Sequence, residues 1–164
     1  MLTTPVRTSV ALAFLASTQL AGCCFSAFAD GFQQGFSTEM ECQPLIDTVN
    51  QASGAVIAVP ETPEGGSQAQ FDAEYTALAT AYESGANLLA GVALTQPALV
   101  APRDELVALY REGAGGMRAM PGLMASATAS GDPSALNAHV QQFSDFDARE
   151  EQIVARINAA CNRQ

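Results

Sequence analysis

Apolar residues recur at alternating steps of three and four positions along four stretches of the chain. In the first stretch the apolar positions that share one helical face are Cys42, Leu45, Val49, Ala52 and Val56. This spacing is that of an amphipathic helix, which buries one stripe of side chains and exposes the rest. We therefore predict a first helix over residues 39–58, with Ser37 or Thr38 as its N-cap.

The next two stretches repeat this period. A second helix is predicted from Gln68 to about Thr95. Its inner face is formed by Phe71, Tyr75, Leu78, Tyr82, Gly85 or Ala86, Leu89, and Val92 or Ala93. A third is predicted from Arg103 to Ala129, and its inner face is formed by Leu106, Leu109, Tyr110, Gly113, Met117, Met120 and Met124. Pro121 followed by Gly122 is expected to kink or break this third helix.

A fourth helix is predicted from a cap at Asp132 or Ser134 to the end of the chain. Its apolar face contains Leu136, Val140, Phe143, Ile153 or Val154, Ile157 and Cys161. Asp147 and Glu150 interrupt this face at its middle. Because acidic side chains are rarely buried without a partner, we interpret the two as solvated by a slight rotation of the face, and not as a catalytic or metal-binding pair.

Short links rich in proline and glycine separate the four predicted helices. Such links make consecutive helices antiparallel neighbours, so the pattern predicts an all-α protein, an up-down-up-down four-helix bundle over residues 39–164. Several helical glycines are expected to let the helices approach closely opposite Tyr and Phe rings. These glycines are Gly85, Gly91, Gly113, Gly115 and Gly116.

The N-terminal residues differ from the bundle. Arg7 precedes an apolar stretch from Val10 to Leu20, which is too short to cross a hydrocarbon core of ~30 Å. The stretch ends in Leu20-Ala21-Gly22-Cys23, where a branched and two small residues directly precede a cysteine. This tetrapeptide resembles the lipobox of bacterial lipoproteins. The resemblance implies a signal peptide over residues 1–22, a diacylglycerol-modified Cys23 and a tether over residues 23–38.

Ordinary signal-peptidase cleavage after Ala29 is the alternative, and it would leave Asp30 as the first residue. Both routes export the chain. The residue after Cys23 is Cys24 and not the aspartate of the inner-membrane retention signal, so the resemblance implies an outer-membrane lipoprotein that faces the periplasm. Four phenylalanines follow at positions 25, 28, 32 and 36. On a helix these rings would form one apolar stripe suited to lying in the membrane interface, which is the alternative. Because Gly31 and Gly35 weaken a helix there and no Lys or Arg flanks it, we expect a loose tether with some aromatic contact to the bundle.

The charge balance narrows the range of partners. The chain has seven arginines, no lysine and seventeen acidic residues, for a formal net charge of −10. Such a chain is not attracted by the phosphates of nucleic acid or by anionic lipid headgroups. Contact with a membrane is therefore expected through the lipid on Cys23 and not through charge.

Two cysteines lie on the apolar faces at opposite ends of the bundle sequence. Cys42 is near the start of the first helix and Cys161 is at the end of the fourth. These ends meet in an up-down bundle, and compartments outside the cytoplasm are oxidising, so we predict a Cys42–Cys161 disulfide. Two buried reduced thiols are the alternative. Cys24 then has no predicted partner, and its role is left open.

The bundle ends carry a second resemblance. Residues 42–46 and 149–161 are similar to the ends of small uncharacterised helical lipoproteins of Gram-negative bacteria. This resemblance covers only these segments and implies no activity.

Known catalytic and cofactor motifs do not fit the sequence. His139 is the single histidine, which excludes multi-histidine zinc sites and the Glu-x-x-His pairs of di-iron bundles. No Cys-x-x-Cys-His haem motif is present, and nothing marks partners for a Ser-His-Asp set. We therefore expect no enzymatic activity and no cofactor. A lower-ranked alternative is a small-ligand or Cu(I)-binding bundle, with Met120, Met124 and His139 as soft ligands on either side of the turn at Gly131; core packing is the usual role of such methionines.

Together these patterns favour one function. We expect a lipid-anchored, periplasm-facing helical bundle that acts without catalysis, as an interaction or structural module with an envelope protein as its partner. A cavity between the second and third helices would favour the ligand-binding alternative.

Overall fold

The computed structural model describes residues 32–162, with side chains from Met40 onward. In this part of the chain all regular structure is helical, which confirms the predicted all-α class. Five helices are present: α1 Phe32–Ile57, α2 Gln68–Ala90, α3 Pro97–Ser130, α4 Ser134–Gln142 and α5 Phe146–Cys161. The expected signal peptide, Cys23 and Cys24 lie outside the described residues.

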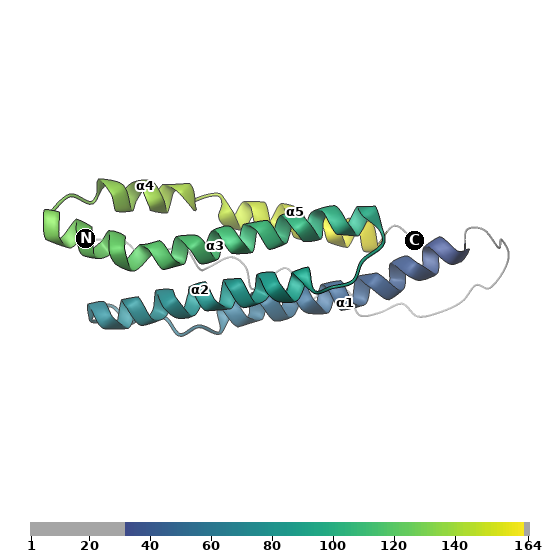
Figure 1. Cartoon of the computed structure of the whole chain (residues 1–164), viewed down its shortest axis with the longest axis horizontal. Helices are drawn as coiled ribbons and strands as arrows, with labels where there is room; N and C mark the ends of the chain where they lie inside the picture. Colours follow the sequence, from purple (N-terminus) through teal and green to yellow (C-terminus); the bar gives the residue numbers. More distant parts are fainter. Residues whose placement is uncertain (1–31, 163–164) are drawn as a thin grey trace.

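The helices form an up-down-up-down bundle whose fourth member is divided into α4 and α5. Figure 1 shows α4 and α5 end to end along α3, with α2 and α1 on the other side. The largest helix–helix interfaces are α2 with α3 and α1 with α2, followed by α3 with α5. The predicted four-helix arrangement is therefore confirmed, whereas the single continuous fourth helix was wrong.

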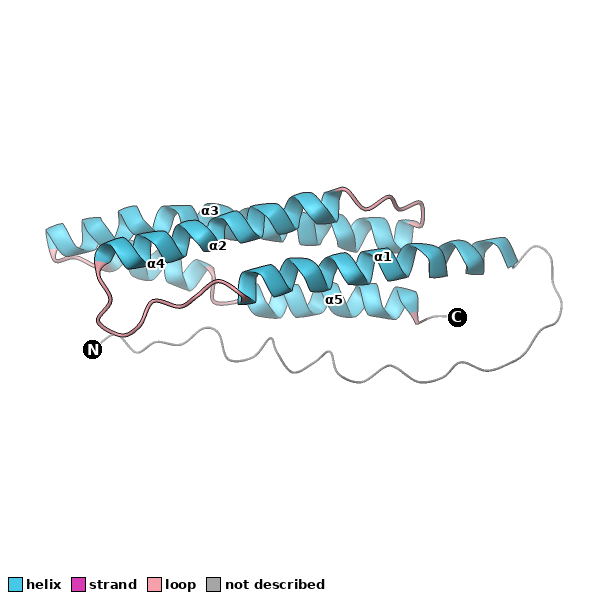
Figure 2. Ribbon diagram, turned by 90° about the horizontal axis from the view of Figure 1, so that it is seen from below, coloured by secondary structure: helices cyan, strands magenta, loops and turns pink. Residues whose placement is uncertain are grey.

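Helix α1 begins earlier than predicted. It starts at Phe32 and includes Pro44, so the last part of the expected tether is helical and Ser37 and Thr38 lie inside the helix, where they cannot cap it. The first turns of α1 extend past the neighbouring helix ends in both views (Figures 1 and 2). From Cys42 onward α1 is part of the bundle, and Cys42, Leu45, Val49 and Ala52 are buried as predicted.

The α2–α3 link begins and ends earlier in the sequence than predicted. Ser67 caps α2 in a capping box with Gln70, and Gly91 ends the helix after Ala90 instead of near Thr95. Pro97 then occupies the first turn of α3, where the missing proline N–H breaks no helical hydrogen bond. Helix α3 therefore starts six residues before the predicted Arg103, and it continues through Pro121 to Ser130 without the break expected there.

The junction between α4 and α5 follows from the length of α1. The residues of α1 and α5 face one another in a single antiparallel register, in which Cys42 lies opposite Cys161 and Ser53 opposite Glu150. In the same register the end of α1 falls opposite the start of α5, so α4 continues along α3 where α1 is absent (Figure 2). Tight turns at Phe143 and Ser144, whose N–H groups bond to the carbonyls of Val140 and Gln141, allow this change of neighbours.

Three glycines admit aromatic rings into the helix interfaces, as predicted. A Cβ atom on Gly85 would lie 2.8 Å from the Tyr110 ring, and one on Gly113 would lie 3.1 Å from the Phe146 ring. Gly116 is in similarly close contact with the ring of Phe143. The prediction was wrong for Gly115, whose Cβ position is open, and for Gly91, which caps α2 and has no ring near its Cβ position.

Candidate functional site

The bundle contains a hydrogen-bonded cluster of three side chains from three helices. We call it the polar node; it consists of Ser53 on α1, Tyr110 on α3 and Glu150 on α5. The Tyr110 hydroxyl donates to Oε1 of Glu150 at 2.8 Å and lies 2.9 Å from Oγ of Ser53. Because a tyrosine has one hydroxyl proton, the Ser53 hydroxyl donates to the Tyr110 oxygen or, at 3.4 Å, to Oε1 of Glu150.

The apolar faces of the helices position these groups. Tyr110 belongs to the inner face of α3 and is 1% exposed. Its ring packs edge-on against Tyr82 of α2, with 5.4 Å between the ring centroids, and lies over the backbone of Gly85. Ser53 follows the buried Ala52 on α1 and is half-buried. Tyr110 is therefore held on both sides, and its hydroxyl has a fixed position for Glu150.

Burial controls the ionisation of the node. Loss of hydration raises the pKa of the Glu150 carboxyl above its ordinary value, and the negative charges of Asp147 and Glu151 add to this effect, whereas the hydroxyls of Tyr110 and Ser53 oppose it. Burial also raises the pKa of Tyr110, which stays a neutral donor. The pKa of Asp147 is raised by burial and by Glu151. The interpretation of Glu150 as a solvated side chain was therefore wrong, because Glu150 is half-buried and bonded within the bundle.

Among the described residues, none that interacts directly with the polar node is a positively charged side chain. The nearest arginine on α5, Arg149, instead forms a two-pronged ion pair with Glu112 of α3, at 3.0 and 2.7 Å. This pairing lowers the pKa of Glu112. A second two-pronged pair joins Arg156 of α5 to Glu105 of α3. Glu150 therefore relies on hydroxyl donors for its hydrogen bonds.

A row of ring contacts leads from the node along the bundle. It contains Tyr110, Tyr82, Phe146, Phe143 and His139, with 5.1 to 6.1 Å between successive ring centroids. At its far end Nε2 of His139 is hydrogen-bonded to the backbone carbonyl of Gly116 at 3.1 Å. His139 is thus level with Gly116, which comes about one helical turn before Met120 and two before Met124.

The copper candidates are therefore only partly brought together. Met120, Met124 and His139 are half-buried in the same half of the bundle, yet Nε2 of His139 is used by the backbone and Met124 lies further along α3. Among the described residues, no three His, Cys, Asp or Glu side chains gather into a set of metal ligands. One surface hollow lies between α1 and α5 and another between α3 and α5. Neither of these two is at the α2–α3 interface, where a cavity would favour the ligand-binding alternative.

The two ends of the bundle are built differently. At the end where α1 enters, Cys42 and Cys161 form the predicted disulfide, with their Cα atoms 5.7 Å apart. Beside it the Glu41 carboxylate accepts hydrogen bonds from the backbone N–H groups of Thr95 and Gln96, at 3.0 and 3.1 Å. We call this the braced end.

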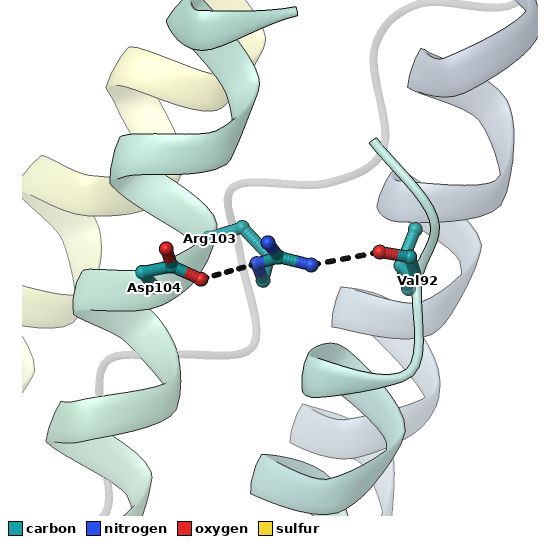
Figure 3. A network of polar contacts seen from close by, with 3 residues as sticks. All are labelled: Val92, Arg103 and Asp104. Carbon is teal, nitrogen blue, oxygen red and sulfur yellow. Dashed lines mark hydrogen bonds and ion pairs between the residues drawn. The ribbon is translucent and has the colours of Figure 1, made fainter. Parts of the chain in front are cut away.

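The largely buried Arg103 completes the braced end. Its guanidinium donates to the carbonyl of Val92 at 2.7 Å and pairs with Asp104 at 2.6 Å (Figure 3). The bond to Val92 fixes the α2–α3 link, because Val92 belongs to the link and Arg103 to α3. No signal within one helix predicts this bond, since it joins residues from different elements.

The opposite end consists of the second half of α3, the turn that follows it and the whole of α4. We call this segment the distal hairpin (residues 117–142). The buried residues of α3 end at Gly116, and α4 has no fully buried residue. Val140, predicted on the inner face, is 48% exposed because α4 has lost α1 as a neighbour. Between Arg118 and Asp145 the sequence has one formally charged residue, Asp132.

Asp132 has a structural role at the turn of this hairpin. Its carboxylate accepts a hydrogen bond from the backbone N–H of Ser134 at 3.0 Å, which fixes the turn after α3. The N-cap residue of α4 is Pro133, and no side chain makes a capping hydrogen bond there, so the predicted cap at Asp132 or Ser134 was wrong.

Comparisons with known proteins add no relative. No family model, no curated protein and no solved structure matches the chain at a significant level. Of the helices within residues 32–162, none combines the length and the apolar character that crossing a bilayer requires.

Proposed function

We propose that this protein is a lipid-anchored, periplasm-facing helical bundle that acts without catalysis as an interaction module of the cell envelope. The distal hairpin carries this proposal. It is a largely exposed segment whose charged residues are Arg118, which pairs with Glu83, and Asp132, on a chain whose formal net charge is −10. A partner that docks there desolvates few charges, and few charges are typical of the central part of a protein–protein interface.

The position of the braced end supports an orientation in which this end of the bundle is nearest to the lipid anchor. The lipobox-like residues Leu20 to Cys23 precede α1, and α1 joins the bundle at Glu41 and Cys42. The disulfide and the Glu41 and Arg103 bonds hold the helix ends at the site where the tether would pull on the bundle. The long axis of the bundle then separates the distal hairpin from the anchor, so that the hairpin points toward partners and away from the lipid.

Site-specific photocrosslinking in the native envelope tests this function. A crosslinker at the exposed Ala138 on α4 is compared with one at the exposed Ala155 on α5. We expect a discrete adduct with an envelope protein from position 138 and none from position 155. The adduct should be lost when Ala135, one turn away on α4, is changed to glutamate. Equal adducts from both positions, or none from position 138, would contradict the proposal.

A further inference from the structure

The polar node joins α1 to α5. Apart from the node, these two helices share the smallest of the main helix–helix interfaces. Helix α5 packs mainly on α3, and its interface with α1 is limited. Along this narrow seam Cys42, Val49 and Ser53 of α1 lie opposite Cys161, Val154 and Glu150 of α5. A small gap remains in the middle of the seam, lined by Ile46, Val49, Val154 and Ile157.

We propose that Glu150 is a proton-controlled latch: its neutral carboxyl holds the first turns of α5 against α1 and α3, and its ionisation loosens them. The contact geometry supports this role. Oε1 of Glu150 is bonded to Tyr110 of α3 and faces Ser53 of α1, so one side chain joins three helices. A charge at this half-buried position loses hydration and gains only hydroxyl donors, which disfavours the docked state.

The surrounding groups strengthen this dependence. On α5, Asp147 and Glu151 are acidic, and Arg149 is committed to Glu112 of α3. Helix α1 has no charged residue between Asp47, which is exposed, and the end of the helix. Helix α2 contributes the ring of Tyr82, which packs against Tyr110. Among the described residues, Arg111 follows Tyr110 on α3 and is exposed, and the groups that act on the Glu150 carboxyl are hydroxyls and carboxylates.

The disulfide limits how far the latch can open. Cys161 ends α5 and is bonded to Cys42 of α1, so the last turn of α5 stays attached whatever the charge of Glu150. Loosening is therefore expected at the start of α5 and at the turns after Phe143, next to the distal hairpin. The device links the acidity around the protein to the mobility of that hairpin.

The sign of the effect follows from linkage. The pKa of Glu150 is raised in the folded state, so its neutral carboxyl stabilises the fold and the docking of α5. This stabilisation is complete when the pH is below the pKa of Glu in the unfolded chain, 4.5, and it is lost as the pH rises through the raised pKa. Glu112 and Glu105 have lowered pKa values because of Arg149 and Arg156, so their contributions are lost as the pH falls through those values. The two effects therefore occupy different pH ranges.

Hydrogen exchange of the full-length chain, corrected for the intrinsic pH dependence of exchange, tests the latch. For amides at the start of α5 we expect exchange to accelerate as the pH rises, by up to ~tenfold for each pH unit between 4.5 and the raised pKa. Glu150→Gln, which mimics the neutral form, should keep slow exchange throughout. The matched control Glu64→Gln removes the same charge from the exposed α1–α2 link and should behave as wild type.

A second measurement reads the carboxyl directly. Carboxyl carbon NMR should give a Glu150 pKa above the ordinary range, and Tyr110→Phe should raise it further because it removes a donor to the ionised form. A Glu150 pKa within the ordinary range would overturn the proposal. So would exchange in α5 that depends on pH equally in wild type and Glu150→Gln.

Discussion

Gly85 of α2 lies beneath the ring of Tyr110, and replacing it with alanine tests how the node is held. The added Cβ would meet ring carbons at 2.8 and 2.9 Å and the Cβ of Ala52 at 3.1 Å. Tyr110 cannot easily withdraw, because it is fully buried, packs against Tyr82 and is bonded to Ser53 and Glu150.

The magnitude has two opposing parts. Alanine in place of glycine favours a helix by about 1 kcal/mol. Overpacking a well-filled interface costs about 1–3 kcal/mol, and losing the hydrogen bond from the Tyr110 hydroxyl to Glu150 costs about 0.5–1.5 kcal/mol more. We therefore expect Gly85→Ala to lower the free energy of unfolding by about 1–3 kcal/mol, since the ring can relax enough to avoid part of the sum.

Gly115 provides the matched control. It lies in the interior of α3, is exposed and has nothing within 4 Å of its Cβ position. Gly115→Ala should thus gain only the helix preference and raise the free energy of unfolding by about 0.5–1 kcal/mol. Thermal and urea unfolding, followed by far-ultraviolet circular dichroism, measures both variants. If Gly85→Ala were as stable as Gly115→Ala, the close packing of Tyr110 on α2 would be refuted.

Two further predictions concern the cysteines and the copper candidates. Replacing both Cys42 and Cys161 with serine should lower the free energy of unfolding, by up to ~4–5 kcal/mol for so long a loop; a chain whose unfolding is unaffected by the replacement, or by reductant, would show that the bridge does not form. Titration with Cu(I) against a competing chelator should show no binding tighter than micromolar, because His139 is level with Gly116, about one helical turn from Met120 and two from Met124. Tight binding that is abolished by His139→Ala or Met120→Ala would contradict this and favour the copper alternative.

The sequence predicts most of the helices and the disulfide because both depend on periodicity along the chain. Once four helices alternate in direction, the start of the first and the end of the last must meet, which places Cys42 beside Cys161. The same reasoning finds the inner faces, including Leu45, Leu89 and Tyr110, all of which are buried.

The division of the fourth helix has a tertiary cause. Residues 134–161 have a helical period throughout, and only the length of α1 decides where the chain must change neighbours. The turns at Phe143 and Ser144 lie just beyond the end of α1 in the antiparallel register. A polar pair, Ser144 and Asp145, directly precedes α5 and is the local signal that could have indicated a new helix start.

The polar node could not be recognised from one helix at a time. Glu150 interrupts an apolar stripe, and its partners come from α1 and α3, 97 and 40 residues away. Extending the antiparallel register from Cys42 and Cys161 to Ser53 and Glu150 would have placed these two side chains together. The burial of Glu150 then follows from geometry, although its hydrogen bond to Tyr110 depends on the side-chain packing around Gly85.

The mass of the N-terminal peptide of the mature protein, isolated from membranes of a bacterium that processes lipoproteins, tests the anchoring proposal most directly. We predict a chain that begins at Cys23 and carries a diacylglycerol group, and we predict that Cys23→Ala abolishes both this mass and the membrane association. An unmodified mature chain that begins at Asp30 would contradict the account.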